Sequence, residues 1–356
     1  MKTRPLVATL FHTGTLAASM ATSLAASLAT STVAMARDRP VESLALADEW
    51  LNSSPLTSAE LRGKVVLVDF WTYTCVNWIR TLPYVRAWAQ KYKEQGLVVV
   101  GVHSPEFEFE KDVPHIRNAI EALRVDFPVA VDSEHAIWNA YGNQYWPAVY
   151  IVDTKGRIRH RQFGEGDYAS IEKAIQELLA ESGRTNVPGG LVSVETKGAE
   201  VAADWDTLRS PENYLGSART QNFSSPEKPR NARPGNYTLP AHLTLNHWAL
   251  AGNWTVSGDA VRLQQANGRI AYRFQARDVN LVMGSGTPGH PVKFRVLIDG
   301  KPPEQAHGTD VDARGFGESS EPRLYQLIRQ HGPIVERLFE IEFLEPGAQA
   351  FSFTFG

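Results

Sequence analysis

The chain contains a single cysteine, Cys75, among its 356 residues. No disulfide bond can therefore form within the chain, which excludes the disulfide framework that stabilises many small secreted domains. The histidines of the C-terminal half show no zinc-ligand spacing, and residues 310–315 contain only part of the ligand set of a calcium loop. The sequence therefore predicts neither a bound metal nor a cofactor.

Neither sign of charge is in large excess. The 36 Lys and Arg residues against 39 Asp and Glu residues give a formal net charge of −3. A nucleic-acid-binding protein usually carries a concentrated excess of basic residues, and this chain has none. We therefore expect no nucleic acid among its partners.

The N-terminal segment lacks an apolar run of the kind that spans a membrane. After Lys2 and Arg4, residues 1–36 form a tract of Ala, Leu, Ser and Thr that is too rich in hydroxyl side chains for a good membrane span. The tract ends in Ala34-Met35-Ala36, a small-residue pattern typical of signal-peptide cleavage. We predict cleavage after Ala36, export to the periplasm or the cell exterior, and no membrane span after cleavage. An uncleaved anchor is the alternative.

The most informative stretch runs from Val68 to Pro83. An apolar strand-like run, residues 65–70, leads into a polar turn at residues 72–74, and Cys75 follows where a helical pattern begins. A thiol at the start of a helix faces unpaired N–H groups and the positive end of the helix dipole, and both favour the thiolate. The position therefore predicts a reactive cysteine whose pKa lies below the free value of about 8.5.

This stretch resembles the active-site segment of the thioredoxin superfamily. That family has an acid six residues before its first active-site cysteine, a tryptophan four before it and a proline eight after it, as at Asp69, Trp71 and Pro83. Two segments most resemble the TlpA/DipZ-like branch of the superfamily: the sequence around Cys75 and the Gly-Val-His-Ser-Pro-Glu segment at 101–106. The second active-site cysteine of the family is replaced here by Trp78.

The resemblance implies a catalytic Cys75 with Asp69 beneath it as the proton-handling group. The alternative for Asp69 is a hydrogen-bonded buried acid without that role. The resemblance also implies a cis peptide bond between Trp146 and Pro147, opposite the cysteine. Strand order adds His103 and Glu106, because the strand Leu97–His103 should end at the same sheet edge as the strand before Cys75. The residues predicted to shape the site are Asp69, Trp71, Thr72, Thr74, Asn77, Trp78, His103, Glu106, Trp146 and Pro147.

Trp78 has two readings. Since residues three apart share a helix face, its indole could cover the thiol or form a wall for a partner. Alternatively it turns inward and joins Trp71 and Trp88 in the core.

The rest of the chain divides by composition. Residues 37–183 alternate strand and helix patterns and predict an α/β thioredoxin-like domain, and residues 184–236 form a Pro- and Gly-rich linker and lead-in. Residues 237–356 carry many short strands between turns and predict an all-β sandwich or jelly roll, with a closing strand pair over residues 342–355. This part resembles the C-terminal domain of DipZ-like proteins, which has the fold of carbohydrate-binding modules. Its aromatic residues Trp248, Trp254 and Tyr272 are either core or a platform for a glycan.

One thiol leaves three functions open. The first is a monothiol oxidoreductase, in which Cys75 forms a mixed disulfide with a protein or small thiol and an external thiol resolves it. The second is a one-cysteine peroxidase that attacks peroxide. Thr72 fits the Thr-x-x-Cys pattern of peroxiredoxins. The proline that peroxiredoxins have seven residues before the cysteine is Val68 in this chain. The third is a non-catalytic envelope or carbohydrate-binding protein.

Overall fold

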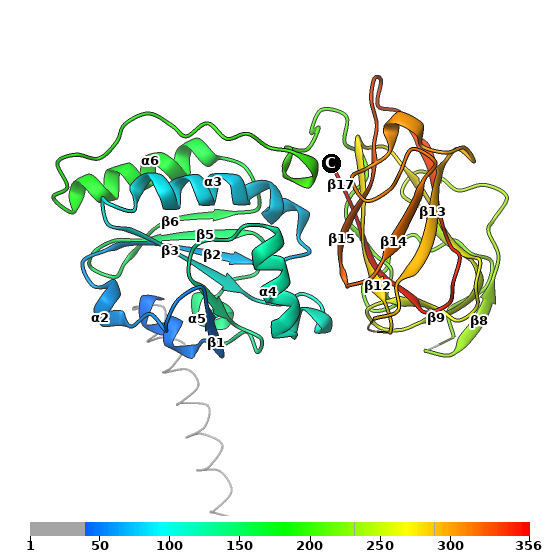
Figure 1. Cartoon of the computed structure of the whole chain (residues 1–356), viewed down its shortest axis with the longest axis horizontal. Helices are drawn as coiled ribbons and strands as arrows, with labels where there is room; N and C mark the ends of the chain where they lie inside the picture. The colour runs from blue at the N-terminus through cyan, green and yellow to red at the C-terminus, as the bar shows by residue number, and fades with distance from the viewer. Residues whose placement is uncertain (1–39, 231, 288) are drawn as a thin grey trace, which may run out of the picture.

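The computed structural model describes residues 40–230, 232–287 and 289–356 (Figure 1). The predicted signal peptide lies outside these residues. The chain forms an α/β domain followed by an all-β domain, as the sequence predicts. Within the described ranges, no helix is long and apolar enough to cross a membrane.

The first domain is built on a six-stranded sheet with the order β1-β4-β3-β2-β5-β6. The three strands β2, β3 and β4 run parallel, while β1, β5 and β6 pair antiparallel with their neighbours. The bounds are β1 (Glu49–Leu51), β2 (Val65–Trp71), β3 (Leu97–His103), β4 (Val129–Val131), β5 (Ala148–Val152) and β6 (Ile158–Phe163). The parallel arrangement brings the ends of β2 and β3 to one edge, where Trp71 pairs with His103.

Helices cover both faces of this sheet (Figure 1). Every residue of β2 is buried, and alternate side chains point to opposite faces. Leu67 packs with α3 and α6, whereas Val68 packs with α5 on the other side. The helices are η1 (Pro40–Leu46), α2 (Ser58–Leu61), α3 (Val76–Tyr92), η2 (Glu108–Lys111), α4 (Val113–Ala122), α5 (Ala136–Tyr141) and α6 (Tyr168–Glu181).

The second domain is a large antiparallel sheet that curls so that its two halves face each other. Its main strand order is β14-β13-β16-β11-β9-β10-β17-β12-β15. Aromatic rings from opposite halves meet in the core, as at Tyr272 and Phe353, whose centroids are 5.0 Å apart. The elements are η3 (Gly198–Glu200), β7 (Asn213–Tyr214), β8 (Pro234–Tyr237), β9 (Trp248–Val256), β10 (Val261–Leu263), β11 (Gly268–Phe274), β12 (Asp278–Ser285), β13 (Val292–Ile298), η4 (Glu304–Ala306), β14 (Phe316–Ser319), β15 (Arg323–Arg329), β16 (Arg337–Phe343) and β17 (Ala348–Phe355).

For this domain one sequence prediction is wrong, and one of two stated alternatives is confirmed. β16 and β17 do not form the closing pair: β16 pairs with β11 and β13, and β17 pairs with β7, β10 and β12. Their connection crosses from one half of the curled sheet to the other, which turn residues alone do not reveal. Trp248, Trp254 and Tyr272 are at most 1% exposed, so they belong to the core and offer no surface to a glycan.

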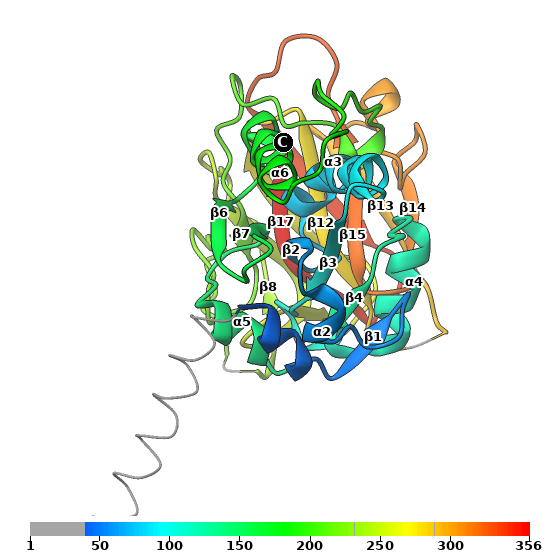
Figure 2. The ribbon, with the colours of Figure 1, turned by 90° about the vertical axis from the view of Figure 1, so that its left-hand side faces the viewer.

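The two domains share an apolar core. Phe351 of β17 lies 5.4 Å from Phe107 and 4.6 Å from Phe109, measured between ring centroids. Val282 and Leu324 join the same cluster from β12 and β15. In Figure 2, which looks from the first domain toward the second, β12, β15 and β17 lie behind β2 and β3. The second domain therefore packs against the sheet edge that carries Cys75.

Candidate active site at the domain interface

Cys75 is the N-terminal capping residue of α3, as the sequence predicts. Its backbone N–H donates to the Thr72 carbonyl at 3.2 Å, and its carbonyl accepts from the Ile79 N–H at 3.0 Å. The backbone N–H groups of Asn77 and Trp78 face the sulfur and lower the pKa of the thiol. The local geometry is that of a cysteine directed by the first turn of a helix.

The Cys75 side chain opens into a cavity of about 390 Å³ between the two domains. From the first domain the cavity is lined by Cys75, Asn77, Arg80, Glu106, Tyr145 and Trp146. The facing wall comes from the lead-in segment and β17 and includes Trp205, Glu212, Tyr214, Arg219 and Phe355. Cys75 is partly exposed, and it faces this cavity.

The prediction of an acidic thiol is wrong. Burial raises the pKa of Cys75 well above its ordinary value, and the nearby carboxyl group of Glu212 raises it further, followed by that of Glu106. The N–H groups at the start of α3 oppose this shift but do not overcome it. The helix terminus acts as expected. The second domain and the lead-in segment cover the thiol, and Glu212 of the lead-in segment and Glu106 of the first domain lie near it.

Trp78 turns inward. Its side chain is fully buried and stacks on Trp71 with a centroid distance of 4.2 Å and an interplanar angle of 22°. The indole N–H donates to Oδ2 of Asp69 at 2.8 Å. Of the two readings of Trp78, the core reading is confirmed, and this indole neither covers the thiol nor forms a wall of the cavity.

Asp69 lies beneath α3 and is also fully buried. Burial raises the pKa of its carboxyl group to about 7, while the hydrogen bond from Trp78 lowers it in part. Asp69 is not among the groups that shift the pKa of Cys75. Its role in handling the proton of the thiol stays a prediction.

His103 is held among aromatic rings. It is fully buried, edge-on to Trp71 at 4.8 Å and stacked on Tyr73 at 5.6 Å. Burial lowers the pKa of its imidazole to about 3, so the ring is neutral at physiological pH. The structure places His103 at the sheet edge expected, but it does not line the cavity.

Thr74 and Glu110 brace the turn before Cys75. Thr74 donates its hydroxyl hydrogen to Oε1 of Glu110 at 2.6 Å, and Oε2 accepts from the N–H groups of Glu106 and Phe107 at 2.6 and 2.9 Å. Burial raises the pKa of Glu110 to about 7, and the hydroxyls of Thr72 and Thr74 lower it in part. Sequence reasoning missed Glu110, because its partner Thr74 lies 36 residues away and no spacing rule connects them.

Glu106 joins the domains across the cavity. Its carboxylate accepts from the Tyr214 hydroxyl at 2.5 Å and from Arg219 Nη1 at 2.8 Å. The guanidinium of Arg219 lies 3.7 Å from the centroid of the Tyr214 ring. Sequence reasoning identified Glu106 but neither of its partners in the lead-in segment.

Trp146 lines the cavity beside Cys75, and its indole N–H donates to the Ser104 carbonyl at 2.9 Å. The Trp146–Pro147 peptide bond is cis, as predicted. Pro147 itself is buried and does not line the cavity. Of the ten residues predicted to shape the site, the structure brings only Asn77, Glu106 and Trp146 to the cavity with Cys75.

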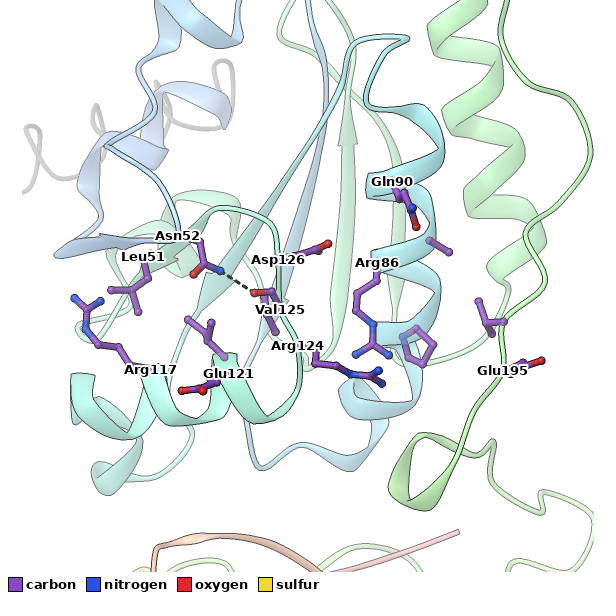
Figure 3. Close-up of a pocket in the computed structure, with 14 residues that line it drawn as sticks. Leu51, Asn52, Arg86, Gln90, Arg117, Glu121, Arg124, Val125, Asp126 and Glu195 are labelled. Carbon is purple, nitrogen blue, oxygen red and sulfur yellow. Dashed lines mark hydrogen bonds between the residues drawn. The ribbon is translucent and has the colours of Figure 1, made fainter.

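A larger cavity of about 860 Å³ lies along the other end of α3 (Figure 3). Its charged lining mixes three arginines with three acids, namely Arg86, Arg117, Arg124, Glu121, Asp126 and Glu195. It contains no cysteine, and its nearest approach along the helix, Pro83, is about two turns beyond Cys75.

Across the described ranges, no group of three or more His, Cys, Asp or Glu residues could hold a metal ion. The smaller cavity at Cys75 is therefore the candidate active site.

Comparison with known families assigns both domains. Residues 38–175 match the Redoxin model, and residues 210–356 match the model described as Thioredoxin like C-terminal domain. Protein DipZ of Mycobacterium bovis is 33% identical over 313 residues, which cover 86% of this chain but only 41% of DipZ. The chain thus spans less than half the length of that relative.

A second relative matches the first domain almost end to end. Thiol-disulfide oxidoreductase YkuV of Bacillus subtilis is 33% identical over 144 residues, or 40% of this chain and 97% of YkuV. Among solved structures, the solution structure of a thioredoxin-like protein in the oxidized form is 35% identical, with a TM-score of 0.35, and the match covers 38% of this chain and 90% of that one. On the matches to YkuV, to the Redoxin model and to DipZ, the chain belongs to the redoxin-class thiol–disulfide oxidoreductase family, in a DipZ-like form with a C-terminal all-β domain.

Proposed function

We propose that this protein exchanges disulfides through Cys75 alone. The thiolate of Cys75 attacks one sulfur of a substrate disulfide, the substrate S–S bond breaks, and the departing thiolate takes a proton from water. The resulting mixed disulfide is resolved by an external thiol, because the chain has no second cysteine. The observation that carries this proposal is the placement of Cys75 at the start of α3, facing a cavity in a redoxin-class domain.

The raised pKa of Cys75 slows this exchange but does not prevent it. Each unit of increase in pKa reduces the thiolate population at neutral pH about tenfold. The remaining thiolate is about threefold more nucleophilic for each unit, since nucleophilicity rises with pKa. The raised pKa of Cys75 also supports a second candidate function, a binding protein with an inert Cys75. It does not separate exchange from the peroxidase, because both reactions begin from a thiolate. The peroxidase ranks lower because Val68 replaces the proline of the peroxiredoxin pattern.

We further propose that the protein works outside the cytoplasm on thiol- or disulfide-bearing partners. The support is the composition of residues 1–36, together with relatives whose names state thiol–disulfide oxidoreductase activity. An oxidising compartment would supply the substrate disulfides that a monothiol protein requires.

The function is tested by incubating the reduced protein with hydroxyethyl disulfide, a small neutral disulfide, and measuring its intact mass. We expect one mixed disulfide per chain, located at Cys75 by peptide mapping and released by added mercaptoethanol. Cys75→Ser should form none. Failure of the folded wild-type protein to form the adduct would leave the inert binding protein as the better explanation. Formation of a sulfenic acid with peroxide, without exchange, would favour the peroxidase.

The pH dependence of Cys75 alkylation provides a separate prediction. Since burial and neighbouring acids raise the pKa of the thiol, the rate with iodoacetamide should rise through a midpoint above the free value of about 8.5. Glu212→Gln removes the first of the neighbouring charges, so the midpoint should move to lower pH. A wild-type midpoint below about 8.5 would mean that the helix terminus outweighs burial and the acids.

A further inference from the structure

The cavity at Cys75 contains one acid, Glu212, that a neighbouring cation, Arg219, balances only in part. Glu106 pairs with Arg219, and Arg80 pairs with Glu165 at 3.0 Å. Glu212 forms no ion pair within the described part of the chain. Glu212 is exposed to water, but the water that it contacts lies in the cavity, where protein lies on several sides of the carboxyl group. Burial and the charge of Glu106 raise the pKa of Glu212 to about 7, while a hydrogen bond with Tyr214 and the charge of Arg219 lower it in part.

Exposed aromatic side chains line the same cavity. Trp205 is 60% exposed and Tyr145 is 51% exposed, which is unusual for side chains of this size, and Trp146 lies beside them. Aromatic faces attract cations, and a carboxylate nearby adds to that attraction. The volume of about 390 Å³ falls within the range of small-molecule sites and is bounded by both domains.

We propose that the substrate of Cys75 is a small disulfide with a cationic ammonium group, an aminothiol disulfide, whose ammonium pairs with Glu212. This inference rests on the proposed exchange function and names its substrate class. An ammonium beside Glu212 also offsets the negative charge that disfavours the thiolate, so the substrate itself promotes ionisation of the thiol that attacks it. The exchange consumes one disulfide and releases one aminothiol for each mixed disulfide formed at Cys75.

The test compares three small disulfides that differ in charge: cystamine, hydroxyethyl disulfide and dithiodipropionate, which are cationic, neutral and anionic. The rate of mixed-disulfide formation is measured by intact mass at about pH 8, where Glu212 is ionised and the ammonium groups remain protonated. Each rate is divided by the rate of free mercaptoethanol with the same disulfide. We expect the normalised ratio of cystamine to dithiodipropionate to be at least about tenfold, as for opposite and like charges a few ångströms apart.

Three variants assign the preference to Glu212. Glu212→Gln should reduce the ratio at least about fivefold, and Glu212→Asp should retain most of it. Glu318→Gln removes an exposed carboxylate of β14 that does not line the cavity, and it should leave the ratio unchanged. Because the ratio compares two substrates of one protein, any change that a variant makes to the thiolate fraction of the free protein cancels.

The outcomes separate the two proposals. Reaction with all three disulfides at a ratio near one, or a ratio that Glu212→Gln leaves intact, overturns the cationic substrate and keeps the exchange function. A preference for dithiodipropionate would assign the cavity to anions through Arg80 and Arg219, and it also overturns this inference. Absence of reaction with every disulfide overturns both proposals.

Discussion

Trp78→Ala is expected to destabilise the first domain by about 3–5 kcal/mol, the range for truncating a buried tryptophan. Trp78 is fully buried, and its removal leaves a cavity beside Trp71, on which it stacks at 4.2 Å. The substitution also removes the donor to Asp69, a buried carboxyl group whose pKa is already raised. Urea unfolding followed by far-UV circular dichroism and tryptophan fluorescence measures the loss.

Trp205→Ala is the matched control, because it truncates the same residue type at a 60% exposed position. Its unfolding free energy should stay within about 0.5 kcal/mol of wild type. Comparable losses in the two variants would contradict the inward packing of Trp78. A change in the relative rates of bulky and small thiol reagents in Trp78→Ala, without loss of stability, would restore the reading in which its indole covers Cys75.

Arg80→Ala is expected to have a similarly large effect and to loosen the contact between the domains. Arg80 and Glu165 form a buried pair at 3.0 Å, with side chains only 2% and 7% exposed. Removing one partner of such a pair leaves an uncompensated buried charge and costs about 3–5 kcal/mol. Nη2 of Arg80 also donates to the Phe355 carbonyl of β17 at 3.2 Å, a contact between the domains.

Two measurements follow for Arg80→Ala. The unfolding free energy should fall, and the loss should shrink as the pH falls, because Glu165 then becomes neutral. Its pKa is already raised by burial, and Arg80, whose charge lowers it, is absent in the variant. Alkylation of Cys75 by a bulky reagent should accelerate more than alkylation by a small one, since the second domain forms the facing wall of the cavity.

Arg159→Ala serves as the control for Arg80→Ala. Arg159 contacts Asp153 and Glu181, but its side chain is 37% exposed, so solvent screens the pairs and little stability should be lost. An Arg80→Ala protein no less stable than Arg159→Ala, with unchanged relative reagent rates, would show that the buried pair does not hold the domains together.

The sequence alone predicted most of the first domain. The strand Leu97–His103 matches the observed bounds, and Cys75 begins its helix as expected. These features depend on hydrophobic periodicity and on neighbours a few residues away, which the sequence displays directly. The cis bond before Pro147 followed from resemblance to the thioredoxin superfamily, and the structure contains it.

What the sequence determined by itself is therefore the local frame: one thiol, placed by a strand, a turn and the first turn of a helix. Only the tertiary structure decided the surroundings of that thiol.

The direction of Trp78 depended on a stacking partner, Trp71, and a hydrogen-bond acceptor, Asp69, both in β2. The wall over Cys75 depended on surfaces that form only after each domain has folded. Tyr214 lies 108 residues beyond Glu106, and Phe355 lies 275 residues beyond Arg80. No local period encodes such contacts. The same docking excludes water from the thiol and brings Glu212 near it, in addition to Glu106. The thiol is therefore less acidic than the helix terminus alone would make it.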